Sequence, residues 1–176
     1  MKKLLLLRHA KSDRGTGFED FERPLNARGR KAAPKMAEAM LARDYMPDAV
    51  LISPAQRTRE TWQLMAAALG VGAPRTEFDE RLYLASAKQI FDLLRKIAPD
   101  AAMPLVIGHN PGIEDLATRL ASERQSAKGE EALDKIRRKY PTCALTVFQL
   151  PIDNWIDLSL ASGTLLEFLT PSSLED

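Results

Sequence analysis

The strongest constraint on this chain is an apolar run of four leucines, Leu4 to Leu7, which Arg8 and His9 follow directly. A strand with one face in water alternates apolar and polar residues, so an unbroken run predicts a strand buried on both faces. Arginine is almost never fully buried without a partner, and Arg8 therefore marks the point where the strand emerges. Ligands of open α/β sheets bind outside the carboxyl ends of the strands, so cations placed there predict an anionic ligand.

The order of the apolar segments predicts the fold class. Strands are expected over residues 1–7, 47–53, 75–78, 103–107, 143–150 and 164–170, and helices over residues 27–43, 55–69, 86–97 and 113–121. Strands that alternate with helices form a mostly parallel sheet with helices on both faces, which is the α/β class. Asn26 and Ser86 are the expected N-caps of two helices. Gly70 should end the second helix, and Pro34 should kink the first.

Two segments have no such assignment. Residues 12–24 form a loop that is long by the usual standard, and a long loop beside a strand end is often functional. Residues Gln125 to Lys139 are strongly charged, and we expect a solvated segment that is helical or loosely ordered.

Composition limits the class of protein. The 176 residues suit one domain over residues 1–176, with 45% hydrophobic and 28% charged residues as in soluble globular proteins. A net charge of +1 gives no strong overall field, so neither nucleic acid nor a membrane is an expected partner, and any cationic site must be local. The first apolar run is too short for a signal peptide or a membrane span, which predicts a cytoplasmic protein.

Two apolar side chains are expected to be structural. The single cysteine, Cys143, excludes an internal disulfide, and its apolar neighbours "CALTVFQL" indicate a buried thiol rather than a nucleophile. Trp62 stands at helical spacing with other apolar residues and is expected in the core.

Polar residues of one kind follow three of the expected strands. Arg8 and His9 follow the first, "SPAQRTRET" with Arg57 follows the second, and "GHN" with His109 follows the strand that begins at Met103. Parallel strands bring their carboxyl ends to one edge of the sheet. The chain has only two histidines, and both stand at such ends. These residues are therefore expected to form one site.

The residue types in this site favour phosphate. Two arginines can fork onto phosphate oxygens, and an imidazole can either donate to a phosphoryl group or attack it. A metal ion is the competing use of paired histidines, but zinc or iron would need a carboxylate or thiolate ligand and would not favour two nearby cations. We therefore expect a phosphate pocket that holds no metal or cofactor.

At this level the sequence resembles a known family. "LLLLRHAKS" resembles the Arg-His motif that opens the histidine phosphatase superfamily, whose fold is that of the cofactor-dependent phosphoglycerate mutases. "RPLNARGR", "SPAQRTRET", "LYLAS" and "GHNPGIEDLA" resemble, in the same order, blocks of the small SixA-type phosphohistidine phosphatases. The resemblance covers Lys2 to about Pro171 and implies a single histidine phosphatase domain, a three-layer α/β/α sandwich like that of phosphoglycerate mutase.

The resemblance implies roles that the chemistry of the residues supports. His9 would be the nucleophile, accepting the phosphoryl group on one ring nitrogen while the other donates to a backbone carbonyl. Its ring must be neutral to attack. Arg8, Arg57 and His109 would bind the phosphoryl oxygens and stabilise the charge during transfer.

Three neighbouring residues each have two alternative roles. Asn110 would either add a donor to the substrate or form the turn. Lys11 and Ser12 would border the pocket as substrate-binding residues or only line the loop. Arg28 and Arg59 are expected to be solvated or structural rather than ligands.

The leaving group decides the substrate. An alcohol leaving from a phosphate ester needs a proton, and ester-cleaving members of the family add a carboxylic acid near the third block. Glu80 in "FDERLYLAS" stands near that place and is the possible general acid, but Asp79 adjoins it and the flanking pattern differs from the mutases. We expect a solvated carboxylate at Glu80. Imidazole leaving from phosphohistidine needs less help.

The short length of the chain indicates which kind of substrate it can bind. The large members of the family carry insertions that close over small metabolites, and 176 residues leave little room for such a lid. An open pocket would admit a phosphohistidine on a protein surface, so the expected substrate is a phosphorylated protein, and the expected state is a monomer. A small phosphate ester is the alternative substrate. A phosphate-binding interaction module without turnover is the alternative class of function.

Overall fold

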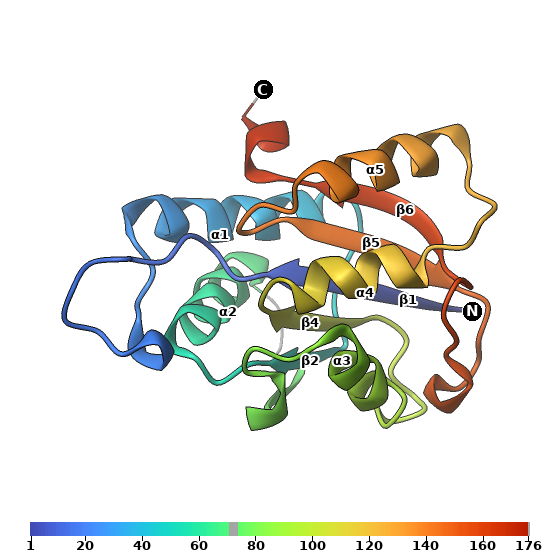
Figure 1. Cartoon of the computed structure of the whole chain (residues 1–176), viewed down its shortest axis with the longest axis horizontal. Coiled ribbons are helices and arrows are strands. Elements are labelled where there is room, and N and C mark those ends of the chain that lie inside the picture. The colour runs from blue at the N-terminus through green and yellow to red at the C-terminus, as the bar shows by residue number, and fades with distance from the viewer. Residues whose placement is uncertain (71–73, 176) are drawn as a thin grey trace.

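The computed structural model describes residues 1–70 and 74–175 and contains a six-stranded sheet (Figure 1). Its strands are β1 (Lys2–Arg8), β2 (Ala49–Ile52), β3 (Arg75–Phe78), β4 (Pro104–Gly108), β5 (Leu145–Leu150) and β6 (Thr164–Leu169). They lie in the order β3-β2-β4-β1-β5-β6. Neighbours from β3 to β1 pair in parallel, and β5 pairs antiparallel with both β1 and β6. The prediction of a mostly parallel sheet is confirmed.

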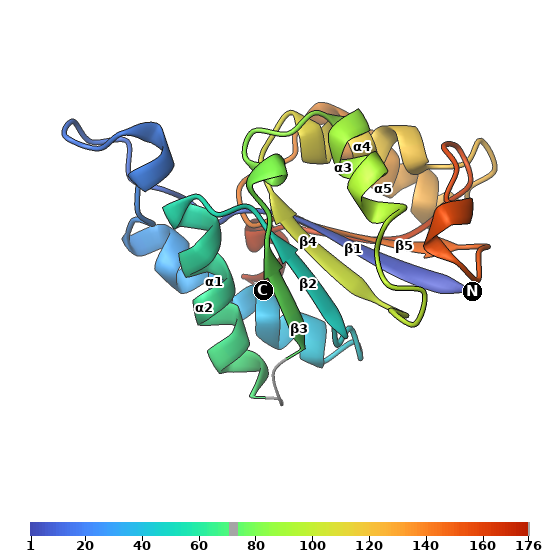
Figure 2. The ribbon, with the colours of Figure 1, turned by 90° about the horizontal axis from the view of Figure 1, so that it is seen from below.

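Helices cover both faces of the sheet (Figures 1 and 2). The helices are α1 (Ala27–Leu41), α2 (Gln56–Leu69), α3 (Ala87–Leu94), α4 (Gly112–Leu120) and α5 (Ala127–Arg138). Short 3₁₀ turns are η1 (Asp20–Glu22), η2 (Glu80–Leu82), η3 (Trp155–Asp157) and η4 (Pro171–Leu174). Helices α1 and α2 share one hydrophobic core with the sheet, and α3, α4 and α5 share the other. None of the helices in the described ranges is long and apolar enough to span a bilayer.

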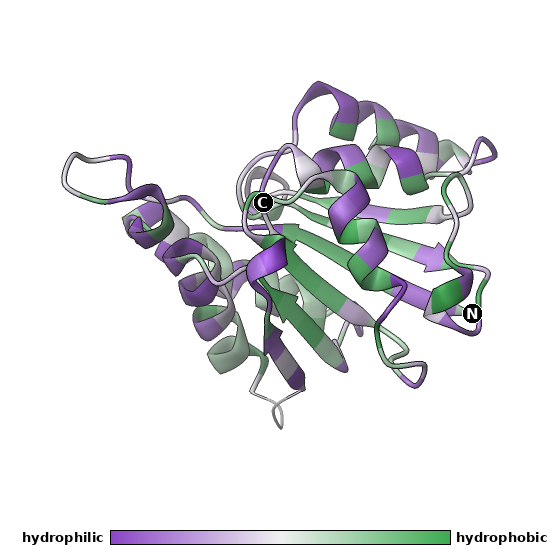
Figure 3. Ribbon diagram, turned by 60° about the horizontal axis from the view of Figure 1, so that its bottom comes forward, coloured by the Kyte–Doolittle hydropathy of each residue, from purple (hydrophilic) through white to green (hydrophobic). Residues whose placement is uncertain are grey.

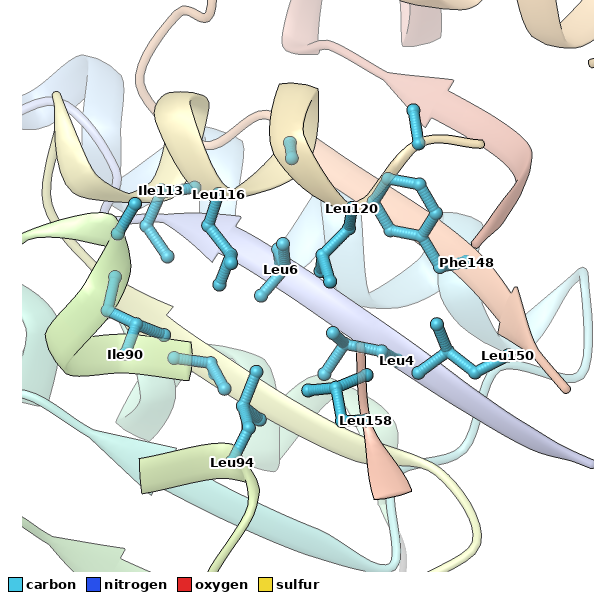
Figure 4. Close-up of a cluster of buried hydrophobic side chains, with 14 of the residues drawn as sticks. Leu4, Leu6, Ile90, Leu94, Ile113, Leu116, Leu120, Phe148, Leu150 and Leu158 are labelled. Carbon is cyan, nitrogen blue, oxygen red and sulfur yellow. The ribbon is translucent and has the colours of Figure 1, made fainter. Parts of the chain in front are cut away.

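The leucine run of β1 supplies both cores. Leu4 and Leu6 pack with α3, α4 and α5, whereas Leu5 and Leu7 pack with α1 and α2. All four side chains are completely buried, as the sequence predicts. Figure 3 shows the central strands as hydrophobic, and Figure 4 shows Leu4 and Leu6 under the side chains of α4. Burial of each leucine contributes about 1.5–3 kcal/mol to folding, so β1 is the centre of both packed layers.

The expected caps are present, and some helix ends differ. The side chain of Asn26 accepts from the Gly29 N–H, Ser86 forms a capping box, and Gly70 has a left-handed φ of 62°. Helices α1 and α3 end two and three residues before the expected ends, at Leu41 and Leu94. In both cases the chain tightens there into i→i+3 hydrogen bonds, which end the regular helix.

The charged segment from Gln125 to Lys139 forms helix α5, so its helical alternative is confirmed, but the expectation of a purely solvated segment is corrected. Ser126 caps α5, and Ala132, Leu133 and Ile136 are buried in the core of that face. These three apolar residues lie on one side of the helix, because residues three and four apart share a face. The abundant charges around them hide this stripe in the sequence.

Helix α1 approaches the segment after β1 through a glycine. A Cβ at Gly29 would lie 2.1 Å from the Lys11 carbonyl oxygen, a backbone atom that cannot turn away. Alanine normally favours a helix over glycine by about 1 kcal/mol. We nevertheless expect Gly29→Ala to lower the free energy of unfolding by about 1–3 kcal/mol in urea denaturation, as overpacking does.

The control for this prediction is an exposed position of the same helix. Glu38→Ala should change the free energy of unfolding by less than about 0.5 kcal/mol, as substitutions at exposed surface positions usually do. A Gly29→Ala protein more stable than the wild type would show that α1 and the Lys11 backbone are not in close contact.

Candidate active site

His9 lies just beyond β1 with its backbone fixed on both sides. Its N–H donates to the Gly108 carbonyl of β4, and its own carbonyl accepts from the Cys143 N–H. The ring Nδ1 lies 2.7 Å from the Ala10 carbonyl oxygen. Because a carbonyl only accepts, Nδ1 carries the proton and Nε2 keeps its lone pair. The expected tautomer is therefore present.

Arg57 and His109 meet beside His9. The His109 and His9 ring centroids are 5.3 Å apart. Arg57 Nη2 lies 3.2 Å from His109 Nδ1, and Ser53 Oγ lies 2.7 Å from His109 Nε2. A guanidinium only donates, so Nδ1 accepts and Nε2–H of the neutral ring donates to Ser53. His109 thus reaches the site as predicted, with both ring nitrogens engaged by protein groups.

Both imidazoles are neutral at ordinary pH. Burial, opposed by the hydrogen bond to Ala10, lowers the pKa of His9 to about 3, and the positive charge of His109 would add to that effect. Burial followed by the charge of Arg57 lowers the pKa of His109 to about 3. A neutral His9 retains the lone pair that a nucleophile needs.

The two arginines each retain a buried nitrogen without a partner. Arg8, the last residue of β1, donates through Nη1 to the Tyr140 carbonyl at 2.9 Å, and Tyr140 is itself held by its hydroxyl on the Leu6 carbonyl. Among the described residues, the buried side-chain nitrogens that lack an acceptor are Arg8 Nε and Arg57 Nε. Such atoms are costly unless they serve a ligand, and here both lie on the arginines predicted to bind phosphate.

A loop carboxylate that sequence reasoning missed holds Arg57. Its Nη1 donates to the Asp20 carbonyl at 2.6 Å and its Nη2 to the Asp20 carboxylate at 3.2 Å. The hydroxyl of Tyr83 also donates to this carboxylate, and that hydrogen bond is the main cause that lowers the pKa of Asp20 to about 2. Asp20 lies in η1, within the loop that projects in Figure 2. The loop over residues 12–24 therefore contacts the site, as its length suggested.

This loop changes the expected shape of the site. Arg57 is 2% exposed, His109 3% and His9 6%. The ring of Tyr83 packs edge-on against His109, and Phe21 packs against Tyr83. The catalytic candidates are thus recessed beneath η1 and Tyr83, and the expectation of an open pocket is corrected: a guanidinium this buried requires the acceptors that Asp20 provides.

A second missed residue, Thr61, ties α2 to the segment after β1. The Ala10 N–H donates to Thr61 Oγ1 at 3.0 Å, and this hydroxyl donates to the Arg57 carbonyl at 2.6 Å. Thr61 stands one helical turn after Arg57 in "SPAQRTRET" and is completely buried. A polar residue on the inward face of an expected helix was the available signal.

The three residues that the sequence offers as substrate-binding candidates have different surroundings. The amide of Asn110 donates to the Tyr140 carbonyl and to Glu114, which supports its turn-forming interpretation over substrate binding. Ser12 is buried and accepts from Arg23, so its hydroxyl serves the loop. Lys11 is half-buried and lines a pocket beside Arg8.

The carboxylates near the third block also differ from one another. Asp79 is buried, caps η2 and pairs with Arg81, so it is structural. Glu80, the first residue of η2, is exposed, as expected of a solvated carboxylate. Cys143 and Trp62 are buried as predicted, and burial raises the pKa of the Cys143 thiol to about 12.

Comparison with known proteins assigns a family. The family model described as the histidine phosphatase superfamily, branch 1, matches residues 4–96, more than half of the 176 residues. The match includes Arg8, His9 and Arg57. The chain belongs to the histidine phosphatase superfamily.

Relatives of this chain span nearly its whole length. An uncharacterized protein of Mycobacterium tuberculosis is 32% identical over 165 residues, which cover 94% of this chain and 99% of that protein. An uncharacterized chloroplastic protein of Arabidopsis thaliana is 31% identical over 171 residues, covering 92% of this chain and 72% of that protein.

Solved structures place it with the SixA type. A candidate SixA phosphohistidine phosphatase from Nakamurella multipartitia matches with a TM-score of 0.78 and 27% identity, covering 97% of this chain and 96% of that one. Its counterpart from Agrobacterium tumefaciens has a TM-score of 0.77 and 27% identity, with 97% and 98% covered. Family membership and these neighbours support phosphatase activity.

The depressed histidine pKa values predict a titration that NMR can follow, because the chain has two histidines. Neither ring should protonate between pH 8 and pH 5, and both should titrate near their folded pKa of about 3. The chain in urea should titrate near the ordinary 6.5.

The same shifts predict how stability depends on pH. The unfolded chain takes up these protons first, so the free energy of unfolding should fall as the pH drops below about 6.5, and keep falling toward about 3. Histidine signals of the folded protein that titrate near pH 6.5 would contradict the buried, neutral arrangement.

Proposed function

We propose that this chain is a phosphatase that forms a covalent phosphohistidine on His9 and acts on phosphohistidine carried by proteins. The observation that supports the mechanism best is the free Nε2 of His9, beside two arginines whose Nε atoms are buried without an acceptor. A phosphoryl group bound there would place its oxygens on the arginines and its phosphorus before Nε2. Catalysis of phosphoryl transfer rests mainly on such positioning and charge stabilisation.

The first step transfers the phosphoryl group. The Nε2 lone pair forms a bond to phosphorus while the P–N bond of the substrate breaks, and the departing imidazole keeps that electron pair and takes a proton from water. Nδ1–H of His9 stays on the Ala10 carbonyl and stabilises the positive charge that develops on the ring. A water then attacks the phosphorus, the bond to Nε2 breaks, and inorganic phosphate leaves.

Three side chains would stabilise the charge on the phosphoryl oxygens. Arg8 and Arg57 would donate through their Nε atoms and remain oriented by the Tyr140 and Asp20 carbonyls. His109 would exchange Ser53 for a phosphoryl oxygen, with Nε2–H as the donor. Asp20 and Thr61 are positioning residues in this scheme because they hold Arg57 and the Ala10 backbone.

The leaving group favours phosphohistidine over an alkyl phosphate. Alkoxide is a poor leaving group and requires a general acid, whereas imidazole leaves with less help. Asp79 is committed to Arg81, and Glu80 is exposed at the start of η2. The carboxylate of Asp20, whose pKa is about 2, is ionised at neutral pH and cannot supply a proton.

The covalent step predicts that His9 is essential. His9→Ala should abolish hydrolysis of an aryl phosphate, whose leaving group needs no acid, because the transferring nitrogen is lost. His9→Asn, which retains more of the side-chain volume, should behave alike. Wild-type protein quenched during turnover should carry phosphate that is labile in acid and stable in base.

Folding controls accompany this test. Circular dichroism and thermal unfolding should show both His9 variants folded. Full turnover by His9→Asn would exclude the covalent mechanism. A wild-type protein that binds inorganic phosphate but turns over no aryl phosphate would instead indicate a binding module.

Glu80 separates the two substrate classes. Glu80→Gln should scarcely slow cleavage of a phosphohistidine-bearing protein, because imidazole does not depend on a strong acid. If the natural substrate were an alkyl phosphate, the same change would remove about 10²–10⁴-fold of its rate. Aryl phosphate hydrolysis controls for damage to the site. A large Glu80 effect on an alkyl phosphate that is cleaved faster than phosphohistidine would overturn the proposed substrate.

A further inference from the structure

A strongly basic pocket reaches the candidate active site through Arg8. It has a volume of about 520 Å³ and opens between the start of α1, the segment before β5 and the turn η4. One of its lining residues, Glu175, is acidic. Seven are basic: Arg8, Lys11, Arg14, Arg28, Lys31, Lys35 and Lys139. The whole chain carries a net charge of only +1, so this pocket concentrates positive charge in one place.

These cations have no carboxylate partners in the described part of the chain. None of the seven forms an ion pair there, whereas Arg43, Arg75 and Lys88 elsewhere do. They repel one another instead: the charge of Arg14 is the main cause that lowers the pKa of Lys11. A cluster of like charges on a fold of near-zero net charge is costly unless an anion binds to it.

The cluster is connected to the catalytic centre through Arg8. This side chain lines the pocket and also carries one of the two unpartnered buried Nε atoms. An anionic group in the pocket therefore lies beside the place proposed for the phosphoryl group. Arg28, Lys31 and Lys35 extend the charge along α1 for about 10 Å, since a helix rises about 1.5 Å per residue.

Apolar side chains are exposed on the Tyr83 side of the site. Phe21 is 42% exposed and packs on Tyr83, which in turn packs on His109, and Leu84 next to it is 56% exposed. Phe18, in the same projecting loop, is 48% exposed. A small polyanion in the basic pocket would leave these side chains in water, whereas a bound protein would cover the pocket and the apolar side chains together. Exposed aromatic and apolar side chains flanked by charges are typical of protein interfaces.

We propose that the basic pocket binds acidic side chains that flank the phosphohistidine on a partner protein, and so selects phosphoproteins with an acidic surface around the modified histidine. This proposal rests on the proposed function. The cations would attract the partner before contact and orient its phosphohistidine toward His9. Such charge complementarity acts mainly on the rate of association and on the choice of partner.

The test compares one charge-reversed variant on two substrates. Lys31→Glu/Lys35→Glu alters two exposed pocket residues. Lys96→Glu/Arg124→Glu makes the same change in charge at two exposed residues that do not line the pocket. One substrate is a protein domain phosphorylated on histidine with phosphoramidate, with Glu and Asp around that histidine. The other is an aryl phosphate, which carries no acidic side chains for the pocket to bind.

We expect a selective loss. Lys31→Glu/Lys35→Glu should lower kcat/KM for the acidic phosphoprotein by about tenfold or more, mainly through KM, because it replaces attraction by repulsion. Its aryl phosphate hydrolysis should match the wild type, and Lys96→Glu/Arg124→Glu should match the wild type on both substrates. Added salt should lower the wild-type kcat/KM more for the acidic phosphoprotein than for the aryl phosphate, because more charge pairs are screened.

A swap of charges on the substrate makes the test specific. When the acidic residues around the phosphohistidine are replaced by Lys, the wild type should lose activity and Lys31→Glu/Lys35→Glu should regain it. A structural defect of the variant would not be rescued in this way.

Three outcomes would overturn the proposal, and they separate it from the proposed function. Wild-type cleavage of both phosphoproteins at equal rates, with no effect of the pocket variant, would refute acidic recognition but leave the phosphohistidine activity. Hydrolysis of aryl phosphate without cleavage of either phosphoprotein would refute the substrate itself. Calorimetric binding of inorganic tripolyphosphate that the pocket variant abolishes, with unchanged phosphoprotein turnover, would assign the pocket to a small polyanion.

Discussion

The burial of the Arg57 guanidinium is the interaction on which the arrangement of the site depends. A positive charge that is 2% exposed loses most of its hydration, a cost of several kcal/mol that only hydrogen bonds and opposite charge can offset. Asp20 supplies a carbonyl and a carboxylate, and His109 supplies a ring nitrogen. The position of the long loop and the tautomer of His109 both follow from this one requirement. Holding the Arg57 guanidinium in place as a hydrogen-bond donor thus lowers the stability of the folded chain.

Much of the fold could be predicted because its strongest signals are local. The leucine run of β1 indicates burial on both faces, and it provides side chains to both cores. Asn26 and Ser86 cap helices where the sequence places them. The convergence of His9, Arg57 and His109 follows from the parallel strand order alone, since each stands just past a strand end. Family resemblance added roles to these residues, and the geometry independently gives His9 its free nitrogen.

The rest depends on contacts that no local pattern reveals. Asp20 is 37 residues from Arg57 in the sequence, and the projecting loop that carries it has no apolar period to indicate where it folds back. The buried stripe of α5 consists of only three apolar residues among many charged ones. The density of charge in this segment therefore hid the stripe when the sequence was interpreted. Glu80 and Asp79 are adjacent acids, yet the backbone turn η2 buries one and exposes the other. In each case tertiary packing, rather than composition, decides the environment of the side chain.

The strand β3 has a consequence for the behaviour of the protein at high concentration. It is an edge of the sheet, all four of its residues are exposed, and two of them, Arg75 and Glu77, are charged. An unpaired strand edge is a template onto which another chain can add a strand, and this is a common start of aggregation. Charges on a short edge strand oppose such pairing, because a second strand would have to desolvate them. The edge strand β3 can therefore remain exposed to solvent without promoting the addition of strands from other copies of the protein.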